Sequence, residues 1–286
     1  MIAVTGASGF LGSHILDAFP SDRVVAVARR AVHLPVVRRT ADLRDCSSLE
    51  DAFSGCAVVV ANAALAPGGR SVTEADLREA NLQGTQNTLD AAIAAGVRRV
   101  VLVSTIAVYA SRFGATLTED SALRDPADRS WDFTALTTNP AYARTKAAGE
   151  ALAWAYRDRV ELVVVRPGPI YGPRDHKLTL RYIRWAQSRR RLLPGIVLPH
   201  AYAPDVADLI ARCATDAPAG AVYNCGGHSL SPAAVVAALG QHRVWAIPLP
   251  TPVVVDDRKA QQELGWKPAP VHSALDDCRT WMMAQA

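Results

Sequence analysis

Two side chains suited to proton transfer, Tyr142 and Lys146, lie four residues apart in the segment Tyr-Ala-Arg-Thr-Lys. In a helix this spacing places both on one face, one above the other. A free tyrosine is a poor acid at neutral pH because its pKa is about 10. An ammonium about 4 Å from the phenolate supplies roughly 4 kcal/mol at an effective dielectric constant of about 20, which is comparable to what lowering the pKa to near 7 requires. The pair could therefore exchange a proton during a carbonyl–alcohol redox step without a metal.

Glycines at three-residue spacing follow the first apolar run, in the segment Thr5-Gly6-Ala7-Ser8-Gly9-Phe10-Leu11-Gly12. A turn of this kind needs a residue without Cβ where the backbone bends, another where it approaches a pyrophosphate, and a third where helix and strand pack closely. The N-terminus of the following helix offers free N–H groups and a partial positive charge to phosphate. The turn therefore predicts a dinucleotide site, although a purely structural turn is the alternative.

The end of the second predicted strand indicates which dinucleotide binds. An NAD site usually places a carboxylate there to bind the ribose hydroxyls, whereas this chain reads Val27-Ala28-Arg29-Arg30. Two guanidinium groups instead suit a 2′-phosphate, which each can bind in a bidentate manner. We therefore expect NADP(H) to be preferred, with NAD(H) as an alternative cofactor. The competing interpretation is that both arginines are solvated loop charges.

Further along, the chain resembles the extended short-chain dehydrogenase/reductase family, which includes NAD(P)-dependent epimerases and dehydratases. The resemblance begins with the GxxGxxG spacing of the glycine turn and with the Tyr142–Lys146 pair. It continues in four segments that resemble the family's SSxxVYG, RPxxxYGP, DVA and LGWxP motifs, in the expected order: 103–109, 166–174, 205–207 and 263–268.

The resemblance assigns roles to individual residues. Counting back four from Tyr109 places Thr105 where the family uses a serine or threonine hydroxyl to polarise the substrate oxygen. The implied catalytic residues are Thr105, Tyr142 and Lys146, while Tyr109 is interpreted as a packing or substrate-wall residue. Arg174 is the best-placed candidate for a substrate contact. Together, the turn and the resemblance imply these cofactor-binding residues: Gly6, Ser8, Gly9, Phe10, Leu11, Gly12, Arg29, Arg30, Asp42, Leu43, Ala61, Asn62, Ala63, Asn81, Tyr142, Lys146, Pro167, Gly168 and Ile170.

Three reactions are compatible with this resemblance. Sugar dehydratases of the family place Asp-Glu directly after the threonine, where this chain has Ile106 and Ala107, which cannot do acid–base work. NADPH usually serves net reduction, so we predict an NADPH-dependent reductase of a ketone or aldehyde. Its substrate would be a nucleotide-linked keto-sugar or a natural-product carbonyl, with Tyr142 as general acid. The alternatives are a nucleotide-sugar epimerase with bound NAD(P) and a non-catalytic, NADP-sensing regulator.

The elements that must position these residues alternate between short β-branched runs and amphipathic stretches. A Ser47/Glu50 capping box begins one short helix and Gly55 closes it. Apolar strands with helices between them predict an α/β fold, a Rossmann-type doubly wound parallel sheet. The expected strands are 2–5, 24–28, 57–61, 99–104 and 161–166, and the other expected helices are 11–19, 73–95 and 141–156.

From about residue 167 the pattern becomes irregular, with recurring prolines and helices such as 178–191 and 231–239 between loops. We predict a dinucleotide-binding domain at 1–166 and a small, irregular C-terminal substrate lobe at 167–286, with segments at about 200–226 returning to the sheet. The basic residues between Lys177 and Arg184 could clasp a diphosphate, but helical spacing makes a solvated face an equal alternative.

Composition excludes several other classes. The 286 residues are 50% hydrophobic and carry a net charge of only +4, which does not indicate a nucleic-acid binder. The five cysteines are scattered without a CxxC pair, so neither a zinc site nor a disulfide framework is expected. No signal peptide or membrane-spanning run is evident. We expect a cytoplasmic protein that binds a small-molecule substrate and no metal, with a homodimer through helices 73–95 and 141–156 implied by the family resemblance.

Overall fold

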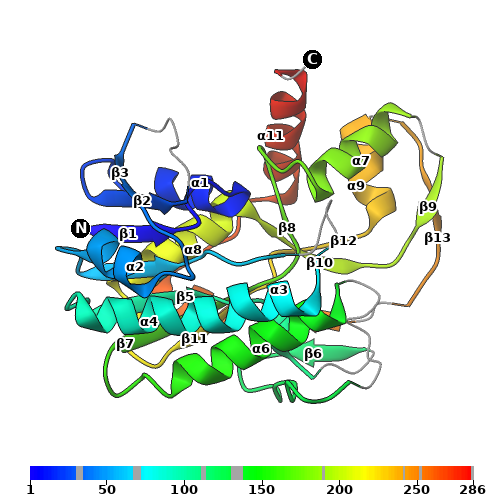
Figure 1. Ribbon diagram of the computed structural model, residues 1–286. Coiled ribbons are helices and arrows are strands. Elements are labelled where there is room, and N and C mark those ends of the chain that lie inside the picture. Colours follow the sequence, from blue (N-terminus) through cyan, green and yellow to red (C-terminus); the bar gives the residue numbers. More distant parts are fainter. Residues whose placement is uncertain are drawn as a thin grey trace.

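Seven parallel strands form the central sheet of the computed structural model, in the order β11-β7-β5-β4-β1-β2-β3 (Figure 1). The structure describes residues 1–29, 35–66, 72–110, 114–129, 138–188, 191–240, 242–250 and 253–284. The strand order runs outward in both directions from β1 and β4, which confirms the Rossmann-type doubly wound α/β fold. The strands are β1 (Ile2–Thr5), β2 (Val24–Ala28), β3 (Val37–Thr40), β4 (Val58–Ala61), β5 (Arg99–Val103), β7 (Glu161–Pro167) and β11 (Val222–Cys225).

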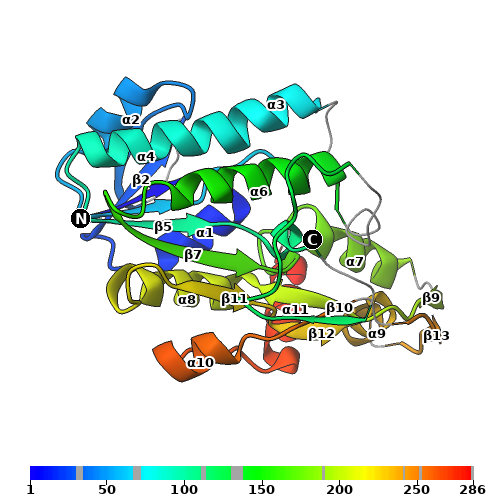
Figure 2. The ribbon, with the colours of Figure 1, turned by 90° about the horizontal axis from the view of Figure 1, so that it is seen from below.

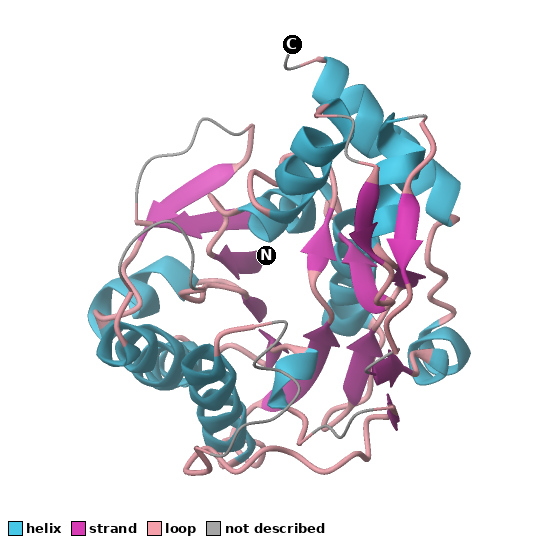
Figure 3. Cartoon of the chain, turned by 90° about the vertical axis from the view of Figure 1, so that its right-hand side faces the viewer, coloured by secondary structure: helices cyan, strands magenta, loops and turns pink. Residues whose placement is uncertain are grey.

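Helices cover both faces of this sheet, as Figures 2 and 3 show from two sides. One face carries α2 (Cys46–Phe53), α3 (Glu74–Arg78), α4 (Gly84–Ala94) and α6 (Pro140–Trp154), and the other carries α1 (Phe10–Asp17) and α8 (Ala203–Thr215). Each face has its own hydrophobic core. In β2, Val24 and Ala26 enter the core with α1 and α8, while Val25 and Val27 enter the other. Because both faces of the strand are buried, its sequence is apolar throughout rather than alternating.

The helix predicted at 73–95 contains a π-helical turn that its sequence did not reveal. Thr73 caps α3 in a capping box with Asp76, and Gly96 ends α4 with a φ of 71°. Between them lies the π-helical segment η1 (Glu79–Gln83). This turn leads into α4 while the side chain of Asn81 remains buried beneath it.

Two other local expectations require correction. The N-cap of α2 is Asp45, whose carboxylate accepts from the Ser48 backbone N–H at 3.2 Å, so the Ser47/Glu50 capping box was wrong by two residues. The helix does end before Gly55, which has a φ of 71°. Strand β3 was not predicted, because it is an exposed edge strand with the polar sequence Val-Arg-Arg-Thr and offers no apolar pattern.

Several small sheets lie beside the main one, built from the C-terminal part and from β6 of the first half of the chain (Figure 1). β8 (Ile170–Tyr171), β10 (Leu198–Tyr202) and β12 (His228–Leu230) form one, β9 (Leu192–Pro194) pairs with β13 (Trp245–Ile247), and β6 (Ala115–Leu117) pairs with β14 (Val253–Val255). The remaining elements are η2 (Ile106–Val108), α7 (Leu178–Gln187), α9 (Pro232–Gly240), α10 (Arg258–Leu264) and α11 (Val271–Met283).

Segment 200–226 contributes to the main layers, since β11 pairs with β7 and α8 packs against α1. Helix α7 ends at Gln187, short of the predicted Arg191, and residues 189–190 lie outside the described part. The boundary between the lobes at residue 166 stays a prediction. Over the described residues, none of the helices combines the length and the hydrophobicity that a membrane span requires.

Candidate active site

A cleft of about 1820 Å³ opens at the carboxyl ends of the central strands, where ligands bind in doubly wound sheets. Single-ligand pockets usually measure about 300–1,000 Å³, so the cleft has room for two ligands. It brings together most of the residues predicted from the sequence. Those that line it are Gly6, Ser8, Gly9, Phe10, Leu11, Gly12, Arg29, Asp42, Leu43, Asn62, Ala63, Thr105, Tyr142, Lys146, Pro167, Gly168, Ile170 and Arg174.

Two predicted residues, Ala61 and Asn81, do not line this cleft. Ala61 is buried in the hydrophobic core under α2 and α4, because it is still part of β4, of which it is the last residue. Asn81 lies behind the cleft, and Arg30 falls outside the described residues.

The glycine turn has the close approaches that its spacing predicts. Gly6 has a φ of 66°, and a Cβ there would lie 2.9 Å from the Ala63 Cα. A Cβ on Gly12 would lie 2.2 Å from the Gly6 carbonyl oxygen, so only glycine lets α1 pack this closely against the turn. No side chain caps α1 at Gly9, and the first residues of the helix line the cleft. The first N–H groups of a helix lack intrahelical partners, so this end is suited to an anion.

Thr5, which the sequence analysis did not single out, joins the ends of β1 and β4. Its hydroxyl oxygen accepts from the backbone N–H groups of Asn62 and Ala63, both at 3.0 Å, and donates to the Val60 carbonyl at 3.3 Å. The Asn62 side chain also donates to the Thr5 carbonyl at 3.3 Å. These bonds hold the floor of the cleft against the glycine turn.

Charged residues gather at the end of the cleft beside β2. The Asp42 carboxylate accepts from the Arg44 guanidinium at 2.7 and 3.1 Å. These hydrogen bonds, more than the nearby charge of Arg29, hold the pKa of Asp42 at about 2. Both arginines line the cleft, and Arg29 is exposed. Arg44 was missed by the sequence analysis, because its position beside Asp42 depends on the turn that follows β3.

Asn81 connects three elements behind the cleft. Its side-chain NH₂ group donates to the Leu65 carbonyl at 3.0 Å and to the Thr145 hydroxyl at 3.1 Å, and its side-chain oxygen accepts from the Leu65 N–H at 2.8 Å. The π-helical turn thus ties the loop after β4 to α6, the helix that carries Tyr142 and Lys146. Asn81, expected from the sequence among the cofactor-binding residues, therefore lies in a supporting position behind the cleft.

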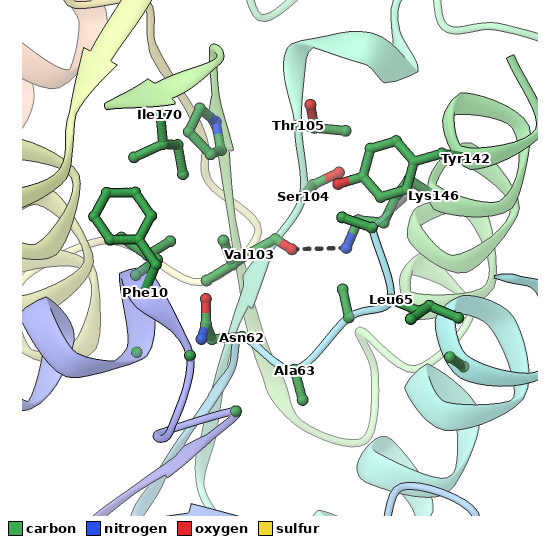
Figure 4. Close-up of a pocket in the computed structure, with 18 of the residues that line it drawn as sticks. Phe10, Asn62, Ala63, Leu65, Val103, Ser104, Thr105, Tyr142, Lys146 and Ile170 are labelled. Atoms are coloured by element: carbon green, nitrogen blue, oxygen red, sulfur yellow. Dashed lines mark hydrogen bonds between the residues drawn. The ribbon is translucent and has the colours of Figure 1, made fainter. Parts of the chain in front are cut away.

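Helix α6 presents Tyr142 and Lys146 to the cleft. The Asn139 side chain caps the helix by accepting from the N–H groups of Ala141 and Tyr142 at 2.8 and 3.2 Å. Tyr142 is half-buried, and Lys146 is only 6% exposed. The Lys146 ammonium donates to the Val103 carbonyl at 2.9 Å, at the end of β5 (Figure 4).

The protonation behaviour of this pair differs from the expectation. Burial raises the pKa of Tyr142 to about 12 rather than lowering it. Burial also lowers the pKa of Lys146 to about 8, against the opposing charge of Glu150. The rise in the Tyr142 pKa is opposite to the lowering expected from the sequence, and its cause is desolvation.

Thr105 lies at the end of β5 and caps η2. Its hydroxyl oxygen accepts from the Ala107 N–H at 3.2 Å, which leaves the hydroxyl hydrogen able to donate into the cleft. Phe10 and Ile170 lie on the opposite side of the cleft from Tyr142, Lys146 and Thr105, with Asn62 and Ala63 between the two sides (Figure 4). A flat ring could therefore be held between an apolar wall and a proton-transfer wall.

A buried polar network supports this wall from behind. Arg166 forms an ion pair with Glu150, and the Ser104 hydroxyl donates to Glu150 at 2.5 Å. Arg166 also donates to the Tyr109 hydroxyl at 2.8 Å, and that hydroxyl donates to Asn224 at 2.6 Å. Tyr109 is fully buried and does not line the cleft, so it is a packing residue rather than a substrate wall.

Arg174 lines the cleft, but its guanidinium is also tied to α1. It donates to His14 Nδ1 at 2.7 Å and to Asp17 at 2.6 Å, while His14 Nε2 bonds the Pro173 carbonyl at 2.9 Å. Among the described residues other than glycine, Arg174 alone has a positive φ, 71°. A substrate role for Arg174 stays a prediction, and this structure adds a tether between α1 and the segment after β8.

The structure offers no metal centre in the part of the chain that it describes: no three His, Cys, Asp or Glu side chains are grouped to hold an ion.

Comparison with known proteins identifies relatives over the whole fold. Residues 2–226 match the model of the NAD dependent epimerase/dehydratase family. A dTDP-glucose 4,6-dehydratase from Streptomyces griseus is 30% identical, over 94% of this chain and 89% of its own length. A dTDP-4-dehydro-6-deoxy-D-allose reductase from a Streptomyces species is 29% identical, over 61% of this chain and 57% of its own. In three further curated relatives the chain spans between 23% and 64% of the relative's length.

Among solved structures, MoeE5 in complex with UDP-glucuronic acid and NAD superimposes with a TM-score of 0.80. It is 26% identical in sequence, and the match covers 100% of this chain and 99% of MoeE5.

Proposed function

Because the chain belongs to the NAD-dependent epimerase/dehydratase family, and is thus an NAD(P)-dependent enzyme of the extended short-chain dehydrogenase type, we propose that it is an NADPH-dependent reductase of a ketone or aldehyde. A nucleotide-linked keto-sugar is the first substrate class to test, since one relative is named for a dTDP-linked keto-sugar and another for dTDP-glucose. The chain spans only part of several relatives, so their substrates need not be its own.

The residues of the glycine turn fit a dinucleotide. Because Gly6 and Gly12 have no Cβ, the turn packs closely against Ala63 and α1 packs closely against the turn. The N-terminus of α1 has no side-chain cap and can bind a pyrophosphate. Thr5 keeps the floor at Asn62 and Ala63 in place beneath it. A nicotinamide cofactor held by these residues would supply the hydride for reduction of the carbonyl carbon.

The observation that carries the proposal is the convergence of Thr105, Tyr142 and Lys146 on one wall of the cleft, opposite Phe10 and Ile170 (Figure 4). Thr105 would donate its hydroxyl hydrogen to the substrate oxygen and stabilise the developing negative charge. Tyr142 would transfer its phenolic proton to the same oxygen. A tyrosine with a pKa of about 12 holds its proton at neutral pH, so the proton that reduction consumes is present. The same raised pKa makes the phenol a weaker acid, so release of the proton needs the positive charge of Lys146. Lys146 would keep positive charge beside the phenolate that forms.

Two apolar residues argue against dehydration. Elimination of water from a sugar requires an acid and a base beside the threonine, and here Ile106 and Ala107 follow Thr105 and line the cleft. Neither side chain can take up or release a proton. A redox step without elimination is therefore the better proposal.

The preference for NADPH is supported by the charges at the β2 end of the cleft. Arg29 is exposed and lines the wall, and the nearby Asp42 carboxylate is paired with Arg44. A free carboxylate would repel a 2′-phosphate, whereas a paired one leaves the site with excess positive charge.

An epimerase is the second candidate, because solved structures similar over almost the whole chain carry NAD together with a nucleotide sugar. The two are separated by incubating the protein with NADPH or NADH and a panel of nucleotide-linked keto-sugars and simple ketones. A reductase consumes the cofactor in proportion to product. Conversion of a nucleotide sugar with no net change in cofactor would replace the proposal with epimerisation, and cofactor binding with no conversion of any substrate would favour a regulator.

A further inference from the structure

Four aliphatic side chains pack together and line the cleft: Ile106 of η2, Leu117 of β6, Leu198 of β10 and Val253 of β14. They belong to one hydrophobic cluster, which we call the aliphatic wall. Leu117 and Val253 are 3% and 6% exposed, so they form its base. Because Ile106 directly follows Thr105, the wall borders the hydroxyl proposed to bind the substrate oxygen.

The wall is built by pairing between distant segments. β14 runs parallel to β6, with Val253 opposite Ala115 and Val255 opposite Leu117. Successive residues of a strand face opposite sides. Val253 accordingly faces the cleft, while Val254 is 44% exposed and does not line the cleft.

An aliphatic wall selects what lies beside the reacting carbonyl. A methyl or methylene group pressed against it leaves water favourably. A hydroxyl in the same place loses its hydrogen bonds to water and meets no partner on these four side chains. Apolar pockets discriminate in this way by up to about a hundredfold.

We infer that the substrate has a methyl or methylene group, in place of a hydroxylated one, on a carbon next to the reacting carbonyl. This inference rests on the proposed reductase function. A deoxy-sugar ketone and an alicyclic ketone share this chemistry. The basic residues Arg174 and Lys177 line another part of the cleft and would suit the anionic carrier of a sugar.

The test uses two matched pairs of ketones with NADPH. One pair is UDP-linked 4-keto-6-deoxyglucose and UDP-linked 4-ketoglucose, and the other is 2-methylcyclohexanone and 2-(hydroxymethyl)cyclohexanone. We expect kcat/KM to favour the methyl-bearing member by about tenfold to about a hundredfold. Turnover of the sugar pair alone identifies a deoxy-sugar substrate, and turnover of the cyclohexanones alone identifies an alicyclic one.

Equal or greater kcat/KM for the hydroxylated member would overturn the inference and leave the reductase intact. If none of the four ketones caused cofactor oxidation, the proposed reductase function would fail and this inference with it. The two failures are therefore distinguishable.

Variants test the wall itself. Val253→Thr keeps the side-chain shape but adds a hydroxyl to the wall, so the preference for the methyl-bearing ketone should fall by about tenfold. Val254→Thr makes the same change on the outer face of β14 and should leave the preference unchanged. Ile106→Thr is the second wall variant. Ile106 is only half-buried, so it tolerates a hydroxyl better than Val253 does. Tm measurements verify that each variant is folded. An unchanged preference in both folded wall variants would contradict the role of the wall.

Discussion

At the scale of single residues, the proton-transfer pair is governed by burial. Lys146 donates to the Val103 carbonyl at 2.9 Å, and burial raises the pKa of Tyr142 to about 12. The phenol is therefore protonated over the physiological pH range, and the reduction proposed here requires that proton. If Tyr142 served only to pack against the cleft, loss of its hydroxyl would not change turnover.

Tyr142→Phe removes the proton and leaves the ring in place. We expect kcat to fall by about 10²-fold or more, because a positioned general acid contributes about 10²–10⁴-fold. The affinity for NADPH, measured by fluorescence titration, should change little.

The matched control is Tyr156→Phe. Tyr156 lies two residues after the end of α6, and its hydroxyl donates to Asp90 at 3.0 Å. This variant should retain nearly normal turnover. A Tyr142→Phe protein with most of its activity would exclude Tyr142 as the acid.

The arginines at the end of β2 give a second prediction. Replacing Arg29 and Arg30 by alanine should raise KM for NADPH by about tenfold or more, because hydrogen bonds to a charged group contribute about 1.5–3 kcal/mol each. KM for NADH should change little, since its ribose carries no phosphate. Steady-state kinetics with both cofactors measures the two values.

Arg38→Ala supplies the control, because Arg38 is an exposed arginine on neighbouring β3 that does not line the cleft. Equal effects of the double replacement on both cofactors would remove the basis for NADP preference.

Much of the site could be predicted at this scale, for a physical reason. Parallel strands place their carboxyl ends at one edge, so Gly6 and Thr105 had to lie near each other once the strands were recognised. The tether of Arg174 to His14 and Asp17 could not be predicted, because it joins residues about 160 positions apart through side chains whose direction no local pattern specifies.

At the scale of elements, α6 is positioned by a close contact with the π-helical turn η1. A Cβ on Gly149 would lie 2.5 Å from the backbone carbonyl oxygen of Asn81. Asn81 in turn holds Leu65 and Thr145. The depth at which α6 packs therefore depends on a glycine two turns after Tyr142.

Gly149→Ala sets two effects against each other. Alanine favours a helix interior over glycine by about 0.8–1 kcal/mol. Overpacking against a backbone atom costs about 1–3 kcal/mol, and the Asn81 carbonyl cannot move without disturbing η1. We expect net destabilisation of about 1 kcal/mol in urea unfolding, with lower kcat as α6 shifts Tyr142.

Ala151→Ser enlarges an exposed residue of the same helix and should leave both stability and kcat nearly unchanged. A Gly149→Ala protein more stable than the parent would show that helix propensity prevails and that the contact can relax.

Element prediction succeeded where patterns were local and failed where they were not. β2 and α6 were found because apolar runs and a four-residue spacing are local signals. The π-helical turn within 73–95 escaped detection because periodicity cannot register a single wider turn. β3 escaped because an exposed edge strand needs no apolar residues.

At the scale of the whole molecule, residues near the C-terminus complete both the site and the core. The pairing of β14 with β6 brings Val253 to the cleft across more than a hundred residues of chain. No sequence periodicity encodes such a pairing, so the aliphatic wall was absent from the sequence analysis. A second long-range connection joins α8 to the segment after α10. The Asp205 carboxylate accepts from the Ala269 N–H at 3.0 Å, and the Asp205 backbone carbonyl accepts from the buried Trp266 indole N–H at 2.9 Å.

Asp205 makes this connection dependent on pH. Burial raises its pKa from 3.8 to about 6, so the folded state binds its proton more tightly than the unfolded state does. The resulting stabilisation is fully present below about pH 3.8 and is lost as pH rises through about 6. At about 1.4 kcal/mol per pKa unit, the loss amounts to about 3 kcal/mol.

Asp205→Asn keeps an acceptor for the Ala269 N–H but cannot ionise. Its free energy of unfolding relative to the parent should therefore rise by up to about 3 kcal/mol between pH 4 and pH 7. Burial lowers the pKa of both His14 and His200, which destabilises the fold as pH falls below about 6.5, but these histidines are common to both proteins and cancel in the difference. Urea unfolding across this pH range measures the difference, and parallel curves for the two proteins would mean that the Asp205 carboxyl titrates alike in the folded and unfolded chains.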